Sequence, residues 1–332
     1  RVQNRSMQAS PDQDFEQIAR ELMRALRGKR SQPAMSRRLG FRTNVAYAWE
    51  AGRSYPTASG FLRAAQRCGV DVRRALEGFY RTPPPWLREQ ASAVSPRAVA
   101  QLLSDLGAGR PIVELAAAVG KSRFAIARFL RGDTEPRLPD FLRLVQGTTL
   151  RLLDFLAAFV DPARLPSVAE AARRLEASRR IAYEEPLTHA VLRVLELADY
   201  RALPAHVDGF IATRLAITLA AERRYLKLLR QSGQVELRAG RLVPTEVSAV
   251  DTRRDPEKAA ALRRFWTQEA LERAGHRDDD VFAFNLGTIA LRDLPRIHEL
   301  HRRYFAELRA IVGASEPAEA LLLANVQLVR MA

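Results

Sequence analysis

The chain has 332 residues, of which 47% are hydrophobic and 27% are charged, a composition typical of a globular protein with two or three hydrophobic cores. This composition excludes a disordered or collagen-like chain, and no uninterrupted apolar stretch approaches the roughly 20 residues of a membrane helix. The single cysteine, Cys68, excludes an intrachain disulfide and a cysteine-based zinc site. We expect a cytoplasmic protein because the N-terminal residues lack an apolar signal core, and Met7 is a candidate natural start.

The net charge of +15 is concentrated near the N-terminal end. Residues 1–90 contain 17 basic and 8 acidic residues, whereas residues 91–164 contain 10 and 7, and residues 165–332 contain 26 and 23. A basic excess of this kind favours a polyanionic partner, because each neutralised phosphate releases counterions. Nucleic acid is the leading candidate partner, and an anionic membrane surface is the second.

An internal repeat organises the N-terminal half. Residues 40–80 match residues 120–160 at an offset of 80 without gaps, and the matching positions include glycines, a proline and apolar residues. The pairs are Gly40/Gly120, Gly52/Gly132, Pro56/Pro136, Phe61/Phe141, Leu62/Leu142, Arg63/Arg143, Gln66/Gln146, Leu76/Leu156 and Phe79/Phe159. We expect two separate small domains, the first copy at 1–81 and the second copy at 97–164, joined by a proline-rich, non-helical linker at 82–96.

The first copy has the apolar spacing of five helices. The first helix is predicted over 15–26, and Ser31 is placed to cap a second helix that ends at Gly40. A third helix is predicted from near Arg42 to Gly52, and two more follow it before the copy ends.

Residues 32–56 resemble the phage-repressor/Cro-like helix-turn-helix family. The similarity lies in Gln32-Pro-Ala-Met-Ser-Arg-Arg-Leu-Gly40, followed by Asn44-Val-Ala-Tyr-Ala-Trp-Glu-Ala-Gly52 and Pro56. The glutamine that begins the second helix, the Leu-Gly turn, and the Trp-Glu-x-Gly that ends the third helix all fall at the family's spacing. The resemblance implies sequence-specific binding of double-stranded DNA, with the third helix in the major groove.

The resemblance also implies roles for individual residues. Asn44 is the best base reader, because an amide can form two hydrogen bonds to adenine. For two pairs of these residues a role without DNA contact stays open. Thr43 and Asn44 would then only cap the third helix, and Arg37 and Arg38 would only form a solvated helix face. The residues at or beside bases would be Arg42, Thr43, Asn44 and Tyr47, and those near the DNA backbone would be Gln32, Arg37, Arg38 and Arg53.

The second copy keeps the core pattern but has a different outer surface. Ile112 stands at the position of Gln32, and Glu114 follows it, so the start of this second helix is poorly suited to phosphate. The copy is therefore either a second DNA reader or a copy used for packing. Its candidate DNA-binding residues are Lys121, Ser122 as the helix cap, Arg123, Phe124 and Arg128.

Residues 165–250 are predicted to form helices followed by a winged helix. Two helices, at 167–180 and 187–198, precede two more at 206–215 and 219–229, and a hairpin is predicted about Ala239-Gly240. Such modules also serve as dimerisation or spacer units. The basic residues that would let this one touch DNA are Arg223, Arg224, Lys227, Arg238 and Arg241.

Residues 251–332 are predicted to form a helix that ends at about Ala274 and a small βαβ unit. The apolar runs at 281–291 and 320–330 read as strands on either side of a helix at 294–312. From residue 165 onward, the order of elements resembles a group of bacterial regulators with a Cro-like domain followed by winged-helix and βαβ regions. We expect this end to mediate homodimerisation or to sense an unidentified effector.

Three patterns resemble catalytic or metal sites and fail on spacing. Gly120-Lys121-Ser122 lacks the phosphate-loop glycine, because Leu115 stands there, and the His298–His301 segment has Arg302 where a zinc-binding helix needs histidine. The three acidic residues at 278–280 are typical of a solvated cap. We therefore predict no catalytic residues, no metal and no cofactor.

The sequence thus predicts a mainly α protein: two tandem five-helix helix-turn-helix domains, followed by a winged helix plus a small βαβ (α+β) domain. We expect a sequence-specific transcription regulator, acting as a repressor on double-stranded DNA. The alternative is a protein-interaction scaffold or antitoxin-like partner that uses helix-turn-helix folds without specific DNA readout. RNA binding and enzymatic activity are the remaining, less favoured classes.

Overall fold

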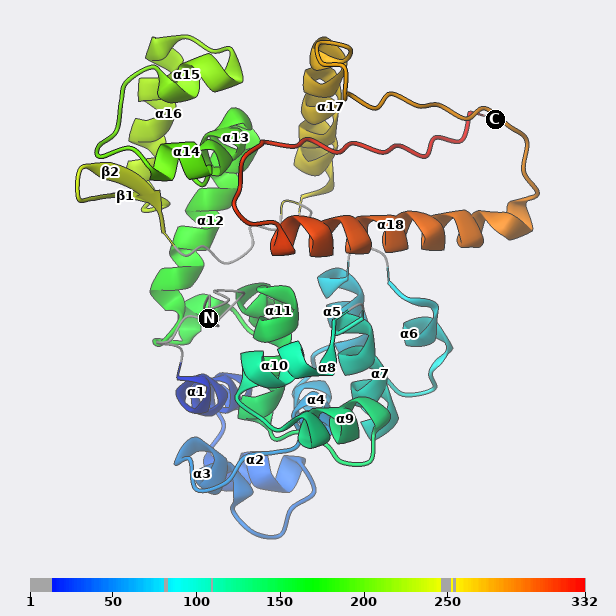
Figure 1. Ribbon diagram of the computed structural model, residues 1–332. Coiled ribbons are helices and arrows are strands. Elements are labelled where there is room, and N and C mark those ends of the chain that lie inside the picture. Colours follow the sequence, from blue (N-terminus) through cyan, green and yellow to red (C-terminus); the bar gives the residue numbers. More distant parts are fainter. Residues whose placement is uncertain (1–13, 81–82, 109, 246–251, 253–254, 332) are drawn as a thin grey trace. The chain divides into compact units, whose positions relative to one another are not determined.

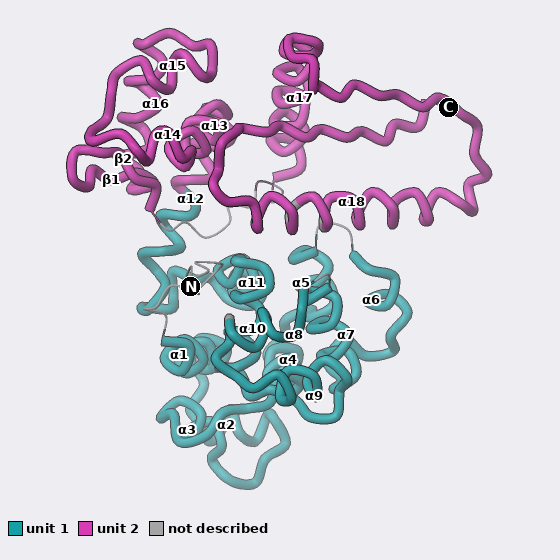
Figure 2. The backbone as a smooth tube through the Cα atoms, viewed as in Figure 1, with its two compact units in different colours: residues 1–176, 248–251 teal, residues 177–247, 252–332 magenta. Residues whose placement is uncertain are grey.

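The computed structural model is mainly helical (Figure 1) and describes residues 14–80, 83–108, 110–245, 252 and 255–331. Met7 and Thr82, the expected start and the first linker residue, lie outside these ranges. The chain divides into two compact units near the middle of helix α12 (Ala169–Glu184), between Glu176 and Ala177 (Figure 2). Among the described residues, no helix combines the length and hydropathy that a membrane span requires.

The first copy forms the five helices that the sequence predicts. Their bounds are α1 Phe15–Arg27, α2 Gln32–Arg38, α3 Val45–Glu50, α4 Ala58–Arg67 and α5 Val72–Phe79. Each begins after a side chain that accepts a hydrogen bond from the first helical turn, and these caps are Asp14, Ser31, Asn44, Thr57 and Asp71. Helix α3 begins at Val45 rather than near Arg42, because Asn44 caps it.

The second copy repeats these helices at the same 80-residue offset. They are α7 Pro96–Leu106, α8 Ile112–Val119, α9 Arg123–Arg131, α10 Leu138–Thr149 and α11 Leu152–Ala157. The turns that follow the second and third helices of each copy contain corresponding backbone hydrogen bonds. Phe41 N donates to Ser36 O at 2.9 Å and Lys121 N to Ala116 O at 3.1 Å, while Arg53 N donates to Ala48 O and Asp133 N to Arg128 O, both at 2.9 Å.

The segment between the copies is not the non-helical linker that its prolines suggest. It contains a short helix, α6 (Pro85–Glu89), whose Leu87 is fully buried. Arg73 of α5 donates hydrogen bonds to three backbone carbonyls of this segment, those of Leu87, Arg88 and Gln90. The prediction was wrong because Pro84 and Pro85 occupy the N-cap and the first helical position, where proline is compatible with a helix.

The two copies share one hydrophobic core. Buried side chains from both belong to a single cluster, in which Phe61 contacts Phe159 at 5.1 Å and Phe79 contacts Phe155 at 5.4 Å between ring centroids. Helix α1 packs on α10, and α4 packs on α7. The copies therefore pack as one unit, rather than as the separate domains expected from the sequence, and the finer domain boundaries stay predictions.

The second unit contains a helical cluster and the predicted hairpin. Strands β1 and β2 pair antiparallel, and Ala239 and Gly240 between them have φ values of 47° and 79°, as a tight two-residue hairpin requires. A one-turn helix of the first unit, η1 (Pro162–Arg164), lies between α11 and α12. The other elements are α13 Leu187–Val194, α14 Ala198–Arg201, α15 Phe210–Leu215, α16 Leu219–Gln231, β1 Val235–Arg238 and β2 Arg241–Pro244.

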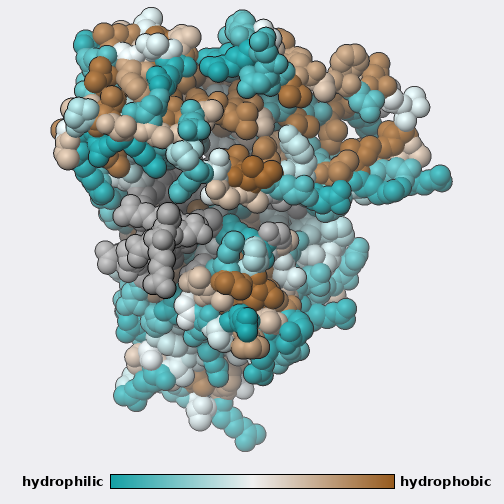
Figure 3. Space-filling model, in the orientation of Figure 1, coloured by the Kyte–Doolittle hydropathy of each residue, from teal (hydrophilic) through white to brown (hydrophobic). Residues whose placement is uncertain are grey.

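The predicted βαβ unit is absent from the described residues. Helices α17 (Pro256–Arg273) and α18 (Leu294–Ala314) form, with a short η2 (Leu291–Asp293) before α18, but the β1–β2 pair is the one sheet in the described chain. Residues 281–290 and 320–330 contain no strand, and Val281 and Phe284 are 90% and 95% exposed. Figure 3 shows hydrophobic residues over these segments. The strand prediction failed because an apolar run forms a strand only when neighbouring strands satisfy its backbone.

The shared core predicts that the two copies unfold together. Replacing Phe155, which is fully buried, with alanine leaves a cavity against Phe79, Phe141 and Phe159 and should cost about 3–5 kcal/mol of stability. Hydrogen exchange of the full chain should then show faster exchange in peptides of both copies. Phe124→Ala, at a 68% exposed site, is the matched control. Loss of protection confined to residues 97–164 would contradict a shared core.

Candidate nucleic-acid interface

The α2–turn–α3 segment presents a basic surface. Residues 28–54 contain six basic residues, Lys29, Arg30, Arg37, Arg38, Arg42 and Arg53, and one acidic residue, Glu50. The basic residues are exposed, whereas Glu50 is buried. The outer surface of this segment therefore carries positive charge without an acidic side chain to offset it.

Glu50 joins α1, α2 and α3 through a buried polar network. Arg27 Nε lies 2.5 Å from Glu50 Oε1, and its Nη2 lies 3.0 Å from Oε2. Gln32 Nε2 donates to Glu50 Oε2 at 3.0 Å. Burial alone would raise the pKa of Glu50, but the hydrogen bonds from Arg27 and Gln32 outweigh it, so the pKa is lowered.

Gln32 was expected near the DNA backbone, and the structure gives its amide an internal partner as well. The side chain is partly exposed, but its nitrogen is held by Glu50. The family spacing identified the residue and not this contact, because Glu50 lies 18 residues away on another helix.

Asn44 performs the capping role that the sequence left open as an alternative. Its Oδ1 accepts hydrogen bonds from Tyr47 N at 3.3 Å and from Ser36 Oγ at 3.2 Å, while the residue as a whole is exposed. Among the described residues, its amide nitrogen makes no hydrogen bond. A bidentate contact with adenine needs both the oxygen and the nitrogen, so the oxygen would exchange one of its present partners for the base.

The other predicted residues of the first copy lie on the exposed surface. Arg37, Arg42 and Thr43 are exposed, and the two arginines form no ion pair with any described residue. Tyr47 is 42% exposed, and the guanidinium of Arg53 lies 4.9 Å from the centre of its ring. Arg38 differs, because its Nε donates to the carbonyl of Arg67 on α4.

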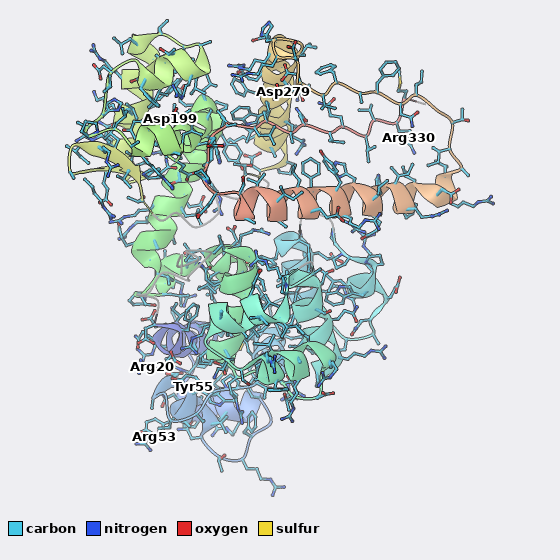
Figure 4. The ribbon with its side chains drawn as sticks, in the orientation of Figure 1. Arg20, Arg53, Tyr55, Asp199, Asp279 and Arg330 are labelled. Carbon is cyan, nitrogen blue, oxygen red and sulfur yellow. The ribbon has the colours of Figure 1, made fainter. Side chains whose placement is uncertain are left out.

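Gly52 ends α3 in a left-handed conformation that fixes the position of Arg53. Its φ is +73°, and an added Cβ would lie 3.1 Å from Arg20 Cδ and 3.3 Å from the Tyr55 hydroxyl. Figure 4 shows Arg20, Arg53 and Tyr55 close together beside α1 and α3. Gly132, the counterpart in the second copy, has a φ of +81°.

The second copy presents a more mixed surface on α8 and α9. Ser122 caps α9 as predicted, accepting from Ala125 N at 3.2 Å, and Arg128 is exposed. Arg123 lies 5.1 Å from the ring centre of Phe124, which is 68% exposed. Lys121 is tied to Asp140 by an ion pair of 3.1 Å, a contact that its spacing did not reveal.

The second copy lacks all three residues of the polar network that Glu50 forms in the first copy. The positions of Arg27, Gln32 and Glu50 correspond to Gly107, Ile112 and Leu130. Ile112 is 40% exposed, and its neighbour Val113 is 65% exposed. The two copies therefore share their backbone fold but differ in the chemistry of their outer surfaces.

The basic residues of the second unit are mostly paired within it. Arg223 Nε lies 3.0 Å from Asp208 Oδ2, Arg224 pairs with Glu185, and Arg238 pairs with Glu236. Arg241 donates to the carbonyl of Arg201. The α16–hairpin region therefore offers less unbalanced positive charge than its composition suggests.

Sequence reasoning missed one cluster of possible metal ligands, formed by His206, Asp208 and Glu222. One ligand atom from each lies within 4.8 Å of the others. Glu222 accepts from Gly209 N at 3.0 Å and Ala212 N at 2.5 Å, and so anchors the start of α15. Arg223 pairs with Asp208, so these carboxylates already have protein partners. No metal-ligand spacing marks the three residues in the sequence; the packing of α15 and α16 brings them together.

Comparison of the chain with protein-family models, with curated proteins and with solved structures finds no significant match. Function is therefore inferred from the residues and their geometry.

The Glu50 network predicts a pH-dependent contribution to stability. Because folding lowers the pKa of Glu50 below its ordinary value, the stabilisation is fully present above that ordinary value and is lost as the pH falls through the folded-state pKa. Glu50→Gln should lower the free energy of unfolding by about 1–3 kcal/mol at pH 7. Urea unfolding should show this difference shrinking below about pH 4.5.

Glu89→Gln is the matched control, since Glu89 is exposed. It should leave the unfolding free energy nearly unchanged at both pH values. A Glu50→Gln deficit that stays constant from pH 7 to pH 3 would contradict an ionised Glu50 held by Arg27.

Proposed function

We propose that the chain is a sequence-specific DNA-binding transcription regulator, acting as a repressor, with α2 and α3 as a helix-turn-helix. The observation that carries this proposal is the exposed basic surface of residues 28–54, whose one acidic side chain is buried. Such a surface attracts the phosphate chain, and the short α3 with its preceding turn has the form of a major-groove reader.

The proposed contacts divide into two kinds. Arg42, Thr43, Asn44 and Tyr47 surround the start of α3 and would read or flank base edges. Arg37, Arg38 and Arg53 would contact phosphates, and the guanidinium of Arg53 packs against the Tyr47 ring. Gln32 would reach the backbone while Glu50 holds its amide in one orientation.

The second copy is proposed as a second reader. Arg123 and Arg128 on α9 would hold phosphate or guanine, and Ser122 would cap the helix at the DNA surface. Lys121 would contribute at the periphery, because its ammonium is partly neutralised by Asp140.

We propose that α15, α16 and the hairpin form a winged helix used as a spacer rather than as a DNA reader. The local pairing of Arg223, Arg224 and Arg238 supports this assignment. The exposed apolar residues of 281–290 and 320–331 are the surface that homodimerisation or an effector would cover. A cytoplasmic location follows from this function as part of the same proposal.

A second candidate function is a protein-interaction scaffold. Ile112, Val113 and Phe124 form an apolar set on α8 and α9, 40%, 65% and 68% exposed, which suits a protein partner better than a phosphate chain. In that case DNA binding would be no stronger than the net charge alone provides.

Selection of bound duplexes from a random pool separates these functions. Enrichment of one sequence, with a higher affinity than a scrambled duplex at two salt concentrations, is the expected result for a regulator. Weak binding that is equally sensitive to salt for every duplex would instead favour the scaffold.

The base-reading role of Asn44 is testable without losing the helix cap. Asn44→Ser retains a capping hydroxyl but removes the amide, so the stability should change little. The affinity for the selected duplex should fall by about 1–3 kcal/mol, while binding to scrambled duplex stays nearly constant.

Two arginine variants calibrate this result. Arg37→Ala should weaken binding to every duplex alike. It should also reduce, by about 1, the steepness with which the logarithm of the affinity falls with the logarithm of the salt concentration. Arg74→Ala removes the same charge from α5 and should have little effect. An unchanged affinity of Asn44→Ser for the selected duplex would show that Asn44 is only a cap.

A further inference from the structure

The two copies in the first unit are related by an approximate two-fold axis. Thr57 and Arg137, which are equivalent positions, form an antiparallel bridge. On either side, Ala58 N donates to Pro136 O at 3.0 Å and Leu138 N donates to Pro56 O at 2.9 Å. These two hydrogen bonds are the same contact with the copies exchanged, which is the mark of a two-fold interface.

The helices around this contact show the same exchange. Helix α1 packs on α10, and α4 packs on α7, so that the first helix of each copy meets the fourth helix of the other. Figure 1 shows α3 and α9 toward the same end of the first unit and α5 and α11 toward the other. The two proposed readers therefore occupy equivalent places about the axis.

An ion-pair network ties the copies together next to the second reader. Arg143 on α10 lies 2.7 Å from Glu16 on α1 and 3.0 Å from Asp140. Asp140 in turn lies 3.1 Å from Lys121, directly before α9. The orientation of α9 is thus linked to the first copy by side chains as well as by backbone hydrogen bonds.

We infer that one chain carries a complete pair of DNA readers and recognises a bipartite, non-palindromic duplex. This inference rests on the proposed function and specifies its target. Two-fold-related readers match the local two-fold symmetry of a duplex and enter successive major grooves, which is the arrangement that repressor dimers reach with two chains. Here the covalent chain and the shared core fix the pair.

The two half-sites must differ because the reading surfaces differ. Asn44 corresponds to Phe124, Ala48 to Arg128 and Arg53 to Asp133. The first copy offers an amide and a hydroxyl near bases, whereas the second offers an arginine suited to guanine and an exposed phenyl ring suited to the thymine methyl group. A palindrome would place one half-site against the wrong surface.

The test is selection with the full-length protein, followed by the chain-to-duplex ratio of the complex by light scattering. The expected motif has two different halves, centred about 10 base pairs apart, with one chain bound per duplex. Arg128→Ala should relax the preference in one half only and Asn44→Ser in the other only. Arg74→Ala on α5, the matched control, should change neither.

Spacing distinguishes a fixed pair from two tethered domains. Adding about five base pairs between the halves turns them to opposite faces of the duplex, so a fixed pair should lose about tenfold or more in affinity. A flexible pair would tolerate the insertion, and that result would overturn the inference.

Two other outcomes are also decisive. A palindromic motif bound by two chains, or a single half-site indifferent to Arg128→Ala, would overturn the inference and leave the proposed DNA binding intact. Failure to enrich any sequence would instead refute the proposed function itself.

Discussion

The antiparallel contact between residues 56–58 and 136–138 is the constraint on which the first unit depends. Its backbone hydrogen bonds set the register of one copy against the other. The helices that follow, α4 and α10, begin within this contact and bury Phe61 and Phe141 completely. Helices α3 and α9 are each joined to this contact by a short turn, so the contact sets the orientation of both proposed readers.

The two copies show the same backbone maintained by different chemistry. In the first copy, a buried carboxylate needs Arg27 and Gln32 around it, whereas Leu130 at the equivalent position of the second copy needs no polar partner. A buried ion pair is often no more stabilising than the apolar side chains that replace it. The network around Glu50 is therefore better explained by the orientation it gives to Gln32 than by stability.

Local patterns predicted the helices of the first unit well. Apolar spacing and the caps Ser31 and Ser122 located α2 and α9, and the 80-residue offset identified the repeat. The same patterns could not show that the copies share a core, because an apolar residue such as Phe155 has the same signature whether it packs within its copy or against the other. The predicted strands at 281–291 and 320–330 failed for a related reason: apolar character does not supply a neighbouring strand.

For the candidate site, the sequence located the residues but not their partners. Asn44 and Ser122 were recognised as possible caps because capping acts over three residues, whereas the contacts of Gln32 with Glu50 and of Lys121 with Asp140 join separate helices. The net charge was equally incomplete as a guide. Arg143 is offset by its ion pairs with Glu16 and Asp140, so it adds little to an external field, while Arg37 and Arg42 form no ion pair with any described residue. The placement of acidic partners, more than the number of arginines, is what distinguishes the α2–α3 surface as a site for a polyanion.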